Sequence, residues 1–148
     1  MTTMTDTLKQ LVETAENGER GYAEGAEKLH KDGHADLAGI FERFSNQRAT
    51  LAKELRTLDP NIGAAETDSK GSLPGALHRG WLALKDAFDG ASPEGVLDAA
   101  EQGEDHAVGV FRDALDGDLA EPARSVVARH LTAIQQAHDE IKRLRNQN

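Results

Sequence analysis

Residues 12–19 read VETAENGE and residues 97–104 read LDAAEQGE, so one short pattern occurs twice in the chain. Each copy lies in a stretch whose apolar residues recur at helical spacing, and each contains a glycine, Gly18 or Gly103. Glycine inside a helix costs about 1 kcal/mol relative to alanine, so two glycines at matching places indicate close helix contact there. The repeat predicts two similar helices.

A second, weaker repeat relates residues 37–51 to residues 127–141. It aligns apolar residues in four places: Leu37 with Val127, Phe41 with Leu131, Phe44 with Ile134, and Leu51 with Ile141. The two repeats together predict two helical hairpins related by an approximate twofold axis. Chance similarity between amphipathic helices is the alternative interpretation.

The helical pattern extends over most of the chain. Apolar residues spaced three and four apart predict helices over residues 5–32, 35–58, 73–88, 93–116 and 121–146. Three helix ends carry matching signals: Gly33 after the first helix, Asp59-Pro60 after the second, and Ser92-Pro93-Glu94 before the fourth. Two long helices, a long connection with a short helix, and two more long helices are typical of a ferritin-like four-helix bundle with one crossover. We therefore predict an all-α fold of this type, forming a single domain over residues 1–148.

Composition and charge exclude several classes of protein. The 148 residues include no cysteine, which excludes disulfides, thiolate metal sites and thiol catalysis. The net charge of −9 makes nucleic acid and anionic membranes poor partners. The basic run at residues 142–145 is explained as favourable charge in the last turn of a helix. A cationic ligand, a metal ion, a protein partner or a second copy of the chain stays open.

The first residues and the hydropathy of the chain indicate its compartment. Residues 1–6 carry neither a basic region nor an apolar stretch, so we expect no signal peptide. No window approaches about 18 consecutive apolar residues, so we expect no membrane span. A cytoplasmic location is the resulting prediction.

One polar residue on each long helix falls on the apolar stripe. Helical geometry aims these four side chains at the bundle axis: Glu19, Arg48, Glu104 and His138. A buried arginine and histidine facing two buried acids would form a charge-balanced polar core, because isolated buried charges are costly.

A metal centre is the alternative interpretation of the same positions. Ferritin-like di-iron proteins place a Glu on two helices and a Glu-x-x-His pair on the other two. Here Glu19 and Glu104 match the single acids, but Ser45-x-x-Arg48 and Gln135-x-x-His138 stand in place of the pairs. Arginine cannot ligate a metal, because it stays protonated and offers only donors.

The metal alternative therefore uses a smaller ligand set. Fe, Mn or Zn would be held by Glu19, Glu104 and His138, with Glu16, Glu101 or Gln135 in addition. Glu16 and Glu101 could equally be solvated neighbours of the central acids.

Other conspicuous residues lie outside this centre. His78, Arg79 and Trp81, within the predicted 73–88 helix, form a candidate contact patch for a second protein. The alternative is that Trp81 seals the side of the bundle. The remaining histidines, His30, His34, His106 and His130, are expected at the surface or at helix edges.

Five motifs in this order are similar to those of a known family. They are ENGERGY at residues 16–22, QR at 47–48, HRGW at 78–81, EQGE at 101–104 and HDEI at 138–141. Together they resemble an uncharacterised bacterial family of ferritin-like four-helix bundles, classed as a domain of unknown function. The resemblance implies the bundle fold and a bacterial cytoplasmic setting, but no substrate. Arg48 belongs to the family pattern, which favours the metal-free interpretation.

Two hypotheses about function follow. The first is a non-enzymatic helical bundle with a stress-related or partner-binding role, which associates with itself through an exposed helix face and needs no cofactor. The second is a metal-binding or oxygen-reactive protein that uses the central carboxylates and His138.

Overall fold

The computed structural model describes residues 3–62 and 92–147 of the chain. The predicted helix over residues 73–88, and with it His78, Arg79 and Trp81, lies outside the described residues. All regular structure in the described part is helical, with four long helices and one short 3-10 turn.

The four long helices have bounds close to those predicted. They are α1 (Met4–Lys31), α2 (Ala35–Arg56), α4 (Pro93–Asp116) and α5 (Ala123–Gln147), and the 3-10 turn η1 covers Pro60–Ile62. The second helix ends two residues earlier than expected, and the last begins at Ala123, after Pro122.

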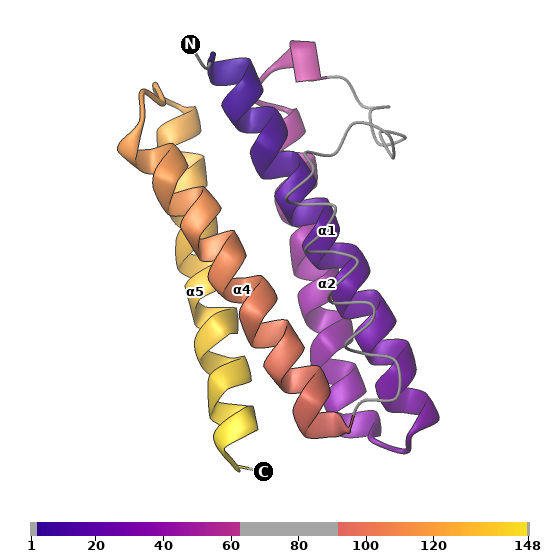
Figure 1. Cartoon of the computed structure of the whole chain (residues 1–148). Coiled ribbons are helices and arrows are strands. Elements are labelled where there is room, and N and C mark those ends of the chain that lie inside the picture. Colours follow the sequence, from indigo (N-terminus) through magenta and orange to yellow (C-terminus); the bar gives the residue numbers. More distant parts are fainter. Residues whose placement is uncertain (1–2, 63–91, 148) are drawn as a thin grey trace.

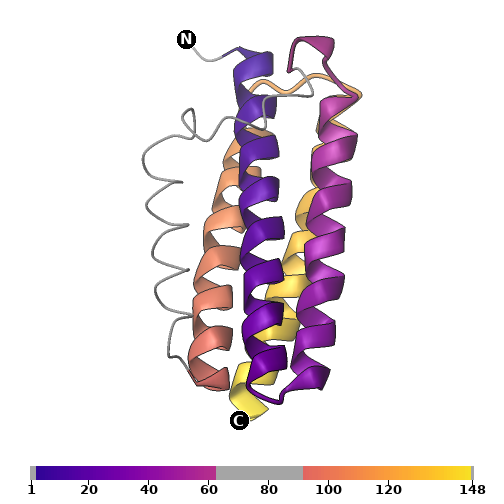
Figure 2. The same ribbon diagram turned by 90° about the vertical axis from the view of Figure 1, so that its right-hand side faces the viewer.

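The helices form two antiparallel hairpins packed side by side (Figure 1). In the first hairpin α1 packs against α2, and in the second α4 packs against α5; α1 also contacts α4, and α2 contacts α5. Figure 2 shows α2 ending at the end of the bundle opposite to the one where α4 begins. Helices α2 and α4 therefore run parallel, whereas the adjacent pairs α1 and α2, α4 and α5, α1 and α4, and α2 and α5 run antiparallel.

Local sequence signals account for the helix ends. Thr3 caps α1 by accepting a hydrogen bond from the Asp6 amide at 3.1 Å, and Ser92 caps α4 by accepting one from the Gly95 amide at 3.1 Å. At the other end of α1, Gly33 has φ 84°, the left-handed conformation that glycine adopts without strain. The His34 amide then reaches back to the Leu29 carbonyl at 2.8 Å, so this tight turn sets the first hairpin.

The apolar core consists of two clusters at opposite ends of the bundle. One surrounds Phe111 and includes Leu11, Leu55, Val127 and Ile134. The other surrounds Phe41 and is built from Tyr22, Leu29, Val96, Leu97 and Ile141, among others. The stretch between these clusters contains the buried charged residues Arg48 and Glu104.

None of the helices in the described part is both long enough and apolar enough to cross a membrane.

Candidate functional site

A buried ion pair lies between the two apolar clusters. Arg48 follows Phe44 and precedes Leu51 on α2, and Glu104 stands between Ala100 and Ala107 on α4. Their side chains are only 2% and 1% exposed. Since Arg48 and Glu104 belong to different hairpins, the pair ties the two hairpins together at mid-bundle.

The pairing uses both oxygens of the carboxylate. Arg48 Nη2 donates to Oε1 and to Oε2 of Glu104, each at 2.6 Å. Arg48 Nε donates to the Gln47 side-chain carbonyl at 3.2 Å. Burying one charge alone is costly, so the Arg48 guanidinium and the Glu104 carboxylate each depend on the other to remain in the core.

Tyr22 of α1 completes the cluster. Its hydroxyl donates to Glu104 Oε2, and the Arg48 guanidinium carbon lies 5.5 Å from the centre of its ring. The Tyr22 ring also makes an edge contact with Phe41 at 5.2 Å between centroids. Glu104 is thus held by one donor from α2 and one from α1.

The surroundings fix the protonation states of Tyr22 and Arg48. Burial raises the pKa of Tyr22 well above its usual value, and the Glu104 charge raises it further. Burial alone would lower the pKa of Arg48, but Glu104 and Tyr22 together outweigh burial, so the pKa of Arg48 is raised. The phenol therefore stays neutral and the guanidinium stays charged across the physiological pH range.

Gly18 makes room for the Arg48 side chain. A Cβ atom placed on Gly18 would lie 3.0 Å from Arg48 Nη1 and 3.2 Å from Arg48 Cγ. Both distances are shorter than ordinary van der Waals contact. The repeated glycine pattern thus has a physical role in α1, where the side chain of α2 passes over the glycine backbone.

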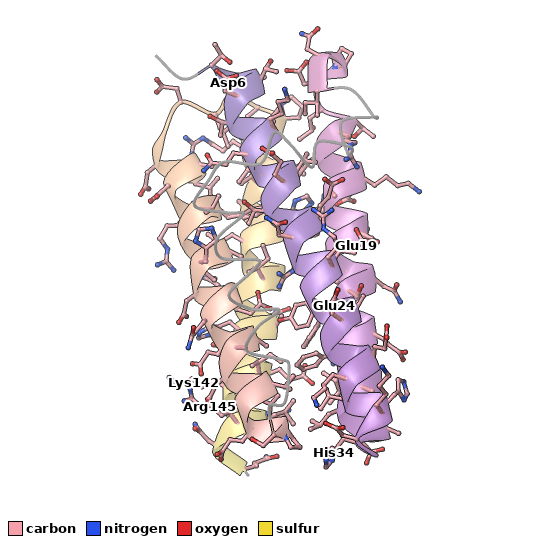
Figure 3. The ribbon with its side chains drawn as sticks, turned by 45° about the vertical axis from the view of Figure 1, so that its right-hand side comes forward. Asp6, Glu19, Glu24, His34, Lys142 and Arg145 are labelled. Atoms are coloured by element: carbon pink, nitrogen blue, oxygen red, sulfur yellow. The ribbon has the colours of Figure 1, made fainter. Side chains whose placement is uncertain are left out.

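Glu19 does not join the cluster. Its side chain, labelled on α1 in Figure 3, is half-buried, and its carboxylate makes no hydrogen bond or ion pair with the residues described. Its backbone carbonyl accepts a hydrogen bond from the Ser45 hydroxyl at 2.9 Å. Gly18, one residue earlier, is the position of α1 that faces Arg48. The sequence predicted Glu19 as one of four residues in a polar core, and the structure corrects this, because Glu19 lies outside the cluster.

His138 lies on the seam between α4 and α5, and it too is outside the cluster. Its Nε2 is 2.7 Å from Asp105 Oδ1 and 3.8 Å from Glu101 Oε2, and its side chain is 20% exposed. Ala137, the preceding residue, occupies the buried position. Partial burial lowers the pKa of His138, but Asp139, Asp105 and Glu101 together outweigh burial and raise it.

Two of the additional candidate metal ligands, Glu16 and Glu101, form ion pairs with arginines. Glu16 pairs with Arg56 of α2, and Glu101 pairs with Arg145 of α5. Figure 3 shows Arg145 and Lys142 near the end of α5, close to the end of the bundle that carries His34. Gln135 is half-buried on α5. Within residues 3–62 and 92–147, no three His, Asp or Glu side chains are grouped so that they could hold one metal ion.

A second buried polar contact, between His130 and Glu54, was not predicted from the sequence. His130 was expected at a helix edge, but its side chain is 0% exposed, and its Nε2 lies 2.7 Å from Glu54 Oε1. The signal was present in the sequence, because His130 stands three residues after Val127 and four before Ile134, both on the apolar stripe of α5.

Comparison with known sequences adds the family. No curated protein matches the chain. The profile of one family matches residues 3–117, which cover α1, α2 and α4 and so include Tyr22, Arg48 and Glu104. The chain belongs to that family, which is described as a domain of unknown function (DUF2383).

Proposed function

We propose that this chain is a non-enzymatic, ferritin-like bundle whose centre is closed by the Arg48–Glu104–Tyr22 cluster, and that it works by binding a protein partner or a second copy at its outer surface. The observation that carries the proposal is the contact of Arg48 Nη2 with both oxygens of Glu104 at 2.6 Å, deep between the two hairpins. A bacterial cytoplasmic setting, implied by the sequence resemblance, is part of the proposal.

The arrangement of the helices supports the ferritin-like part. Helices α2 and α4 run parallel, and each hairpin packs against the other through antiparallel neighbours (Figure 2). A bundle with this direction of its helices needs one connection that returns along its length, which is a feature of ferritin-like folds.

The chemistry of the centre supports the absence of a metal reaction there. A metal ion at this position would be repelled by the Arg48 guanidinium, which cannot lose its proton. It would also need lone pairs on Glu104 that already accept hydrogen bonds from Arg48 and Tyr22. The donor set therefore does not fit Fe, Mn or Zn.

If the centre is closed, a partner would have to bind on the outside of the bundle. The chain carries a net charge of −9, and Met4 is the single large hydrophobic side chain exposed in the described part. Contacts made there would rest on charged and polar groups, and a partner with a basic surface would be attracted over about one Debye length, roughly 8 Å at physiological salt.

Iron oxidation tests the closed centre. Fe(II) is added in air to the wild-type protein and to Glu104→Gln, and the rate is compared with buffer alone. The proposal expects the wild-type protein to match the buffer rate. Oxidation faster than buffer that disappears in Glu104→Gln would show a working metal centre and refute the proposal.

Sedimentation velocity tests the outer surface. The purified protein is examined over a range of concentrations at low and high salt, alone and with a bacterial lysate fraction enriched in basic proteins. The proposal expects either a concentration-dependent dimer or a complex that weakens at high salt. A monomer under every condition would contradict binding through a charged surface.

A further inference from the structure

His130 is a buried titratable group that the central cluster does not use. It lies on α5, at the contact between the two hairpins, and its side chain is 0% exposed. Its Nε2 is 2.7 Å from Glu54 Oε1 of α2. Its other ring nitrogen, Nδ1, is buried and has no hydrogen-bond partner in the described protein.

This geometry defines the tautomer. The Glu54 carboxylate only accepts hydrogen bonds, so Nε2 carries the proton and donates it, and Nδ1 keeps a lone pair. Adding a second proton would place an N–H with no acceptor in the core. It would also place a full positive charge 6.4 Å from the centre of the Phe111 ring of α4.

Burial disfavours that second proton, and the charges around the ring compensate for burial only in part. Glu54 of α2 is the one carboxylate in contact within the described residues, and it is shared, because Arg129 of α5 lies 3.4 Å from the same oxygen. Glu54 is 40% exposed, so solvent screens its attraction for the imidazole. From α4 the neighbour described is the uncharged ring of Phe111. Burial accordingly lowers the pKa of His130, although Glu54 opposes the change.

We propose that His130 and Glu54 form an acid-sensitive latch between the two hairpins. At neutral pH the neutral imidazole stays buried and joins α5 to α2 through its hydrogen bond to Glu54. When the imidazole takes up a proton, Nδ1–H requires water or another acceptor, so the ring leaves the core and the contact between α2 and α5 opens at this end of the bundle.

The direction of the effect follows from proton linkage. The open form has the ordinary histidine pKa near about 6.5, and the closed form has a lower one. The closed form is therefore favoured fully above that value and loses its advantage as the pH falls. For one proton bound only by the open form, the population of open molecules rises up to about tenfold between about pH 7.5 and about pH 5.5.

Reporter thiols measure this opening, since the chain has no cysteine of its own. Val127→Cys places a thiol at a fully buried position one turn before His130, and Ala128→Cys places one at the adjacent exposed position. The rate at which the Val127→Cys protein reacts with 4,4′-dithiodipyridine is divided by the rate for the Ala128→Cys protein, which cancels the intrinsic pH dependence of the thiol. Ala38→Cys, fully buried in the other apolar cluster, reports on unfolding of the whole bundle.

The proposal expects the Val127→Cys ratio to rise severalfold, up to about tenfold, between about pH 7.5 and about pH 5.5. The reaction rate of Ala38→Cys, divided by the same Ala128→Cys rate, should stay level over this range. Adding His130→Gln to the reporter proteins, with the fold checked by circular dichroism, should abolish the rise at Val127→Cys. An unchanged ratio, the same rise in His130→Gln, or an equal rise at both buried reporters would overturn the latch.

A measurement on the unmodified protein keeps the test independent of any variant. The imidazole resonance of His130 is followed by NMR as the pH is lowered. The latch requires a pKa below about 6.5 and exchange broadening of α2 and α5 signals near His130 over the same range. A pKa at or above the ordinary value would overturn the proposal.

Discussion

Replacing Arg48 by methionine removes the buried cation while keeping an unbranched apolar side chain in its place. Glu104 would then keep its contact with Tyr22 but lose the guanidinium that donates to both of its oxygens. Because the Glu104 side chain is only 1% exposed, water cannot replace the lost donor. Breaking one partner of a buried pair typically costs about 3–5 kcal/mol, and we expect a loss in that range.

Urea denaturation followed by far-UV circular dichroism measures this loss. Arg43→Met is the matched control, since Arg43 also lies on α2 and pairs with Glu140, but its side chain is 60% exposed. The control should lose no more than about 1 kcal/mol. In a thermal melt Arg48→Met should lower Tm by roughly 10 °C or more for a chain of this size.

The double variant Arg48→Met/Glu104→Gln separates the loss of an ion pair from the loss of packing. It removes the stranded charge, so much of the stability lost in Arg48→Met should return. An Arg48→Met protein as stable as the wild type would refute the reasoning. A double variant that simply adds the losses of Arg48→Met and Glu104→Gln would refute it as well.

Two further predictions concern close packing and pH. Gly18→Ala should destabilise the protein by about 1–3 kcal/mol, because the new methyl group meets Arg48. The control Gly39→Ala, in an open position on α2, should stabilise it by about 0.5–1 kcal/mol. Equal effects of the two variants in urea denaturation would contradict the close contact between Gly18 and Arg48. The raised pKa of His138 means that its contribution to stability is fully present below about pH 6.5 and is lost as the pH rises through the folded-state pKa. His138→Gln should therefore cost stability at about pH 5.5 and little at about pH 8.5, and an equal cost at both would contradict the ion pairing with Asp105.

Most of the helical architecture could be predicted from sequence, because its signals are local. Gly33, Ser92 and Pro93 each act on the backbone within a few residues, and the structure uses all three as helix-end residues. Apolar spacing identified the four long helices to within two residues at either end, and the largest differences are at the end of α2 and at the start of α5.

The centre was harder to predict, because helical spacing often admits two adjacent residues. Gly18 and Glu19 both lie three or four residues from Ala15 and Tyr22, and Ala137 and His138 stand in the same relation to Ile134 and Ile141. In both cases the small residue lies inward, and the charged one lies at the edge of the stripe, where water reaches it.

The internal repeat also suggested more symmetry than the structure has. Glu19 and Glu104 occupy equivalent places in the two copies, but Tyr22 is matched by Ala107. Only Glu104 meets the Tyr22 hydroxyl and the Arg48 guanidinium, so only Glu104 is compensated well enough to be buried. Periodicity treats a tyrosine as apolar, and this is why its role as a donor was not predicted.

The metal content of the protein tests most directly the central proposal, that the Arg48–Glu104–Tyr22 cluster closes the centre of the bundle to metal ions. The protein would be produced without an affinity tag in medium supplemented with iron, manganese and zinc, and then analysed for metals beside Glu104→Gln. A closed Arg48–Glu104–Tyr22 centre predicts far less than one metal ion per chain in both proteins. One or more equivalents in the wild type, lost in Glu104→Gln, would contradict it.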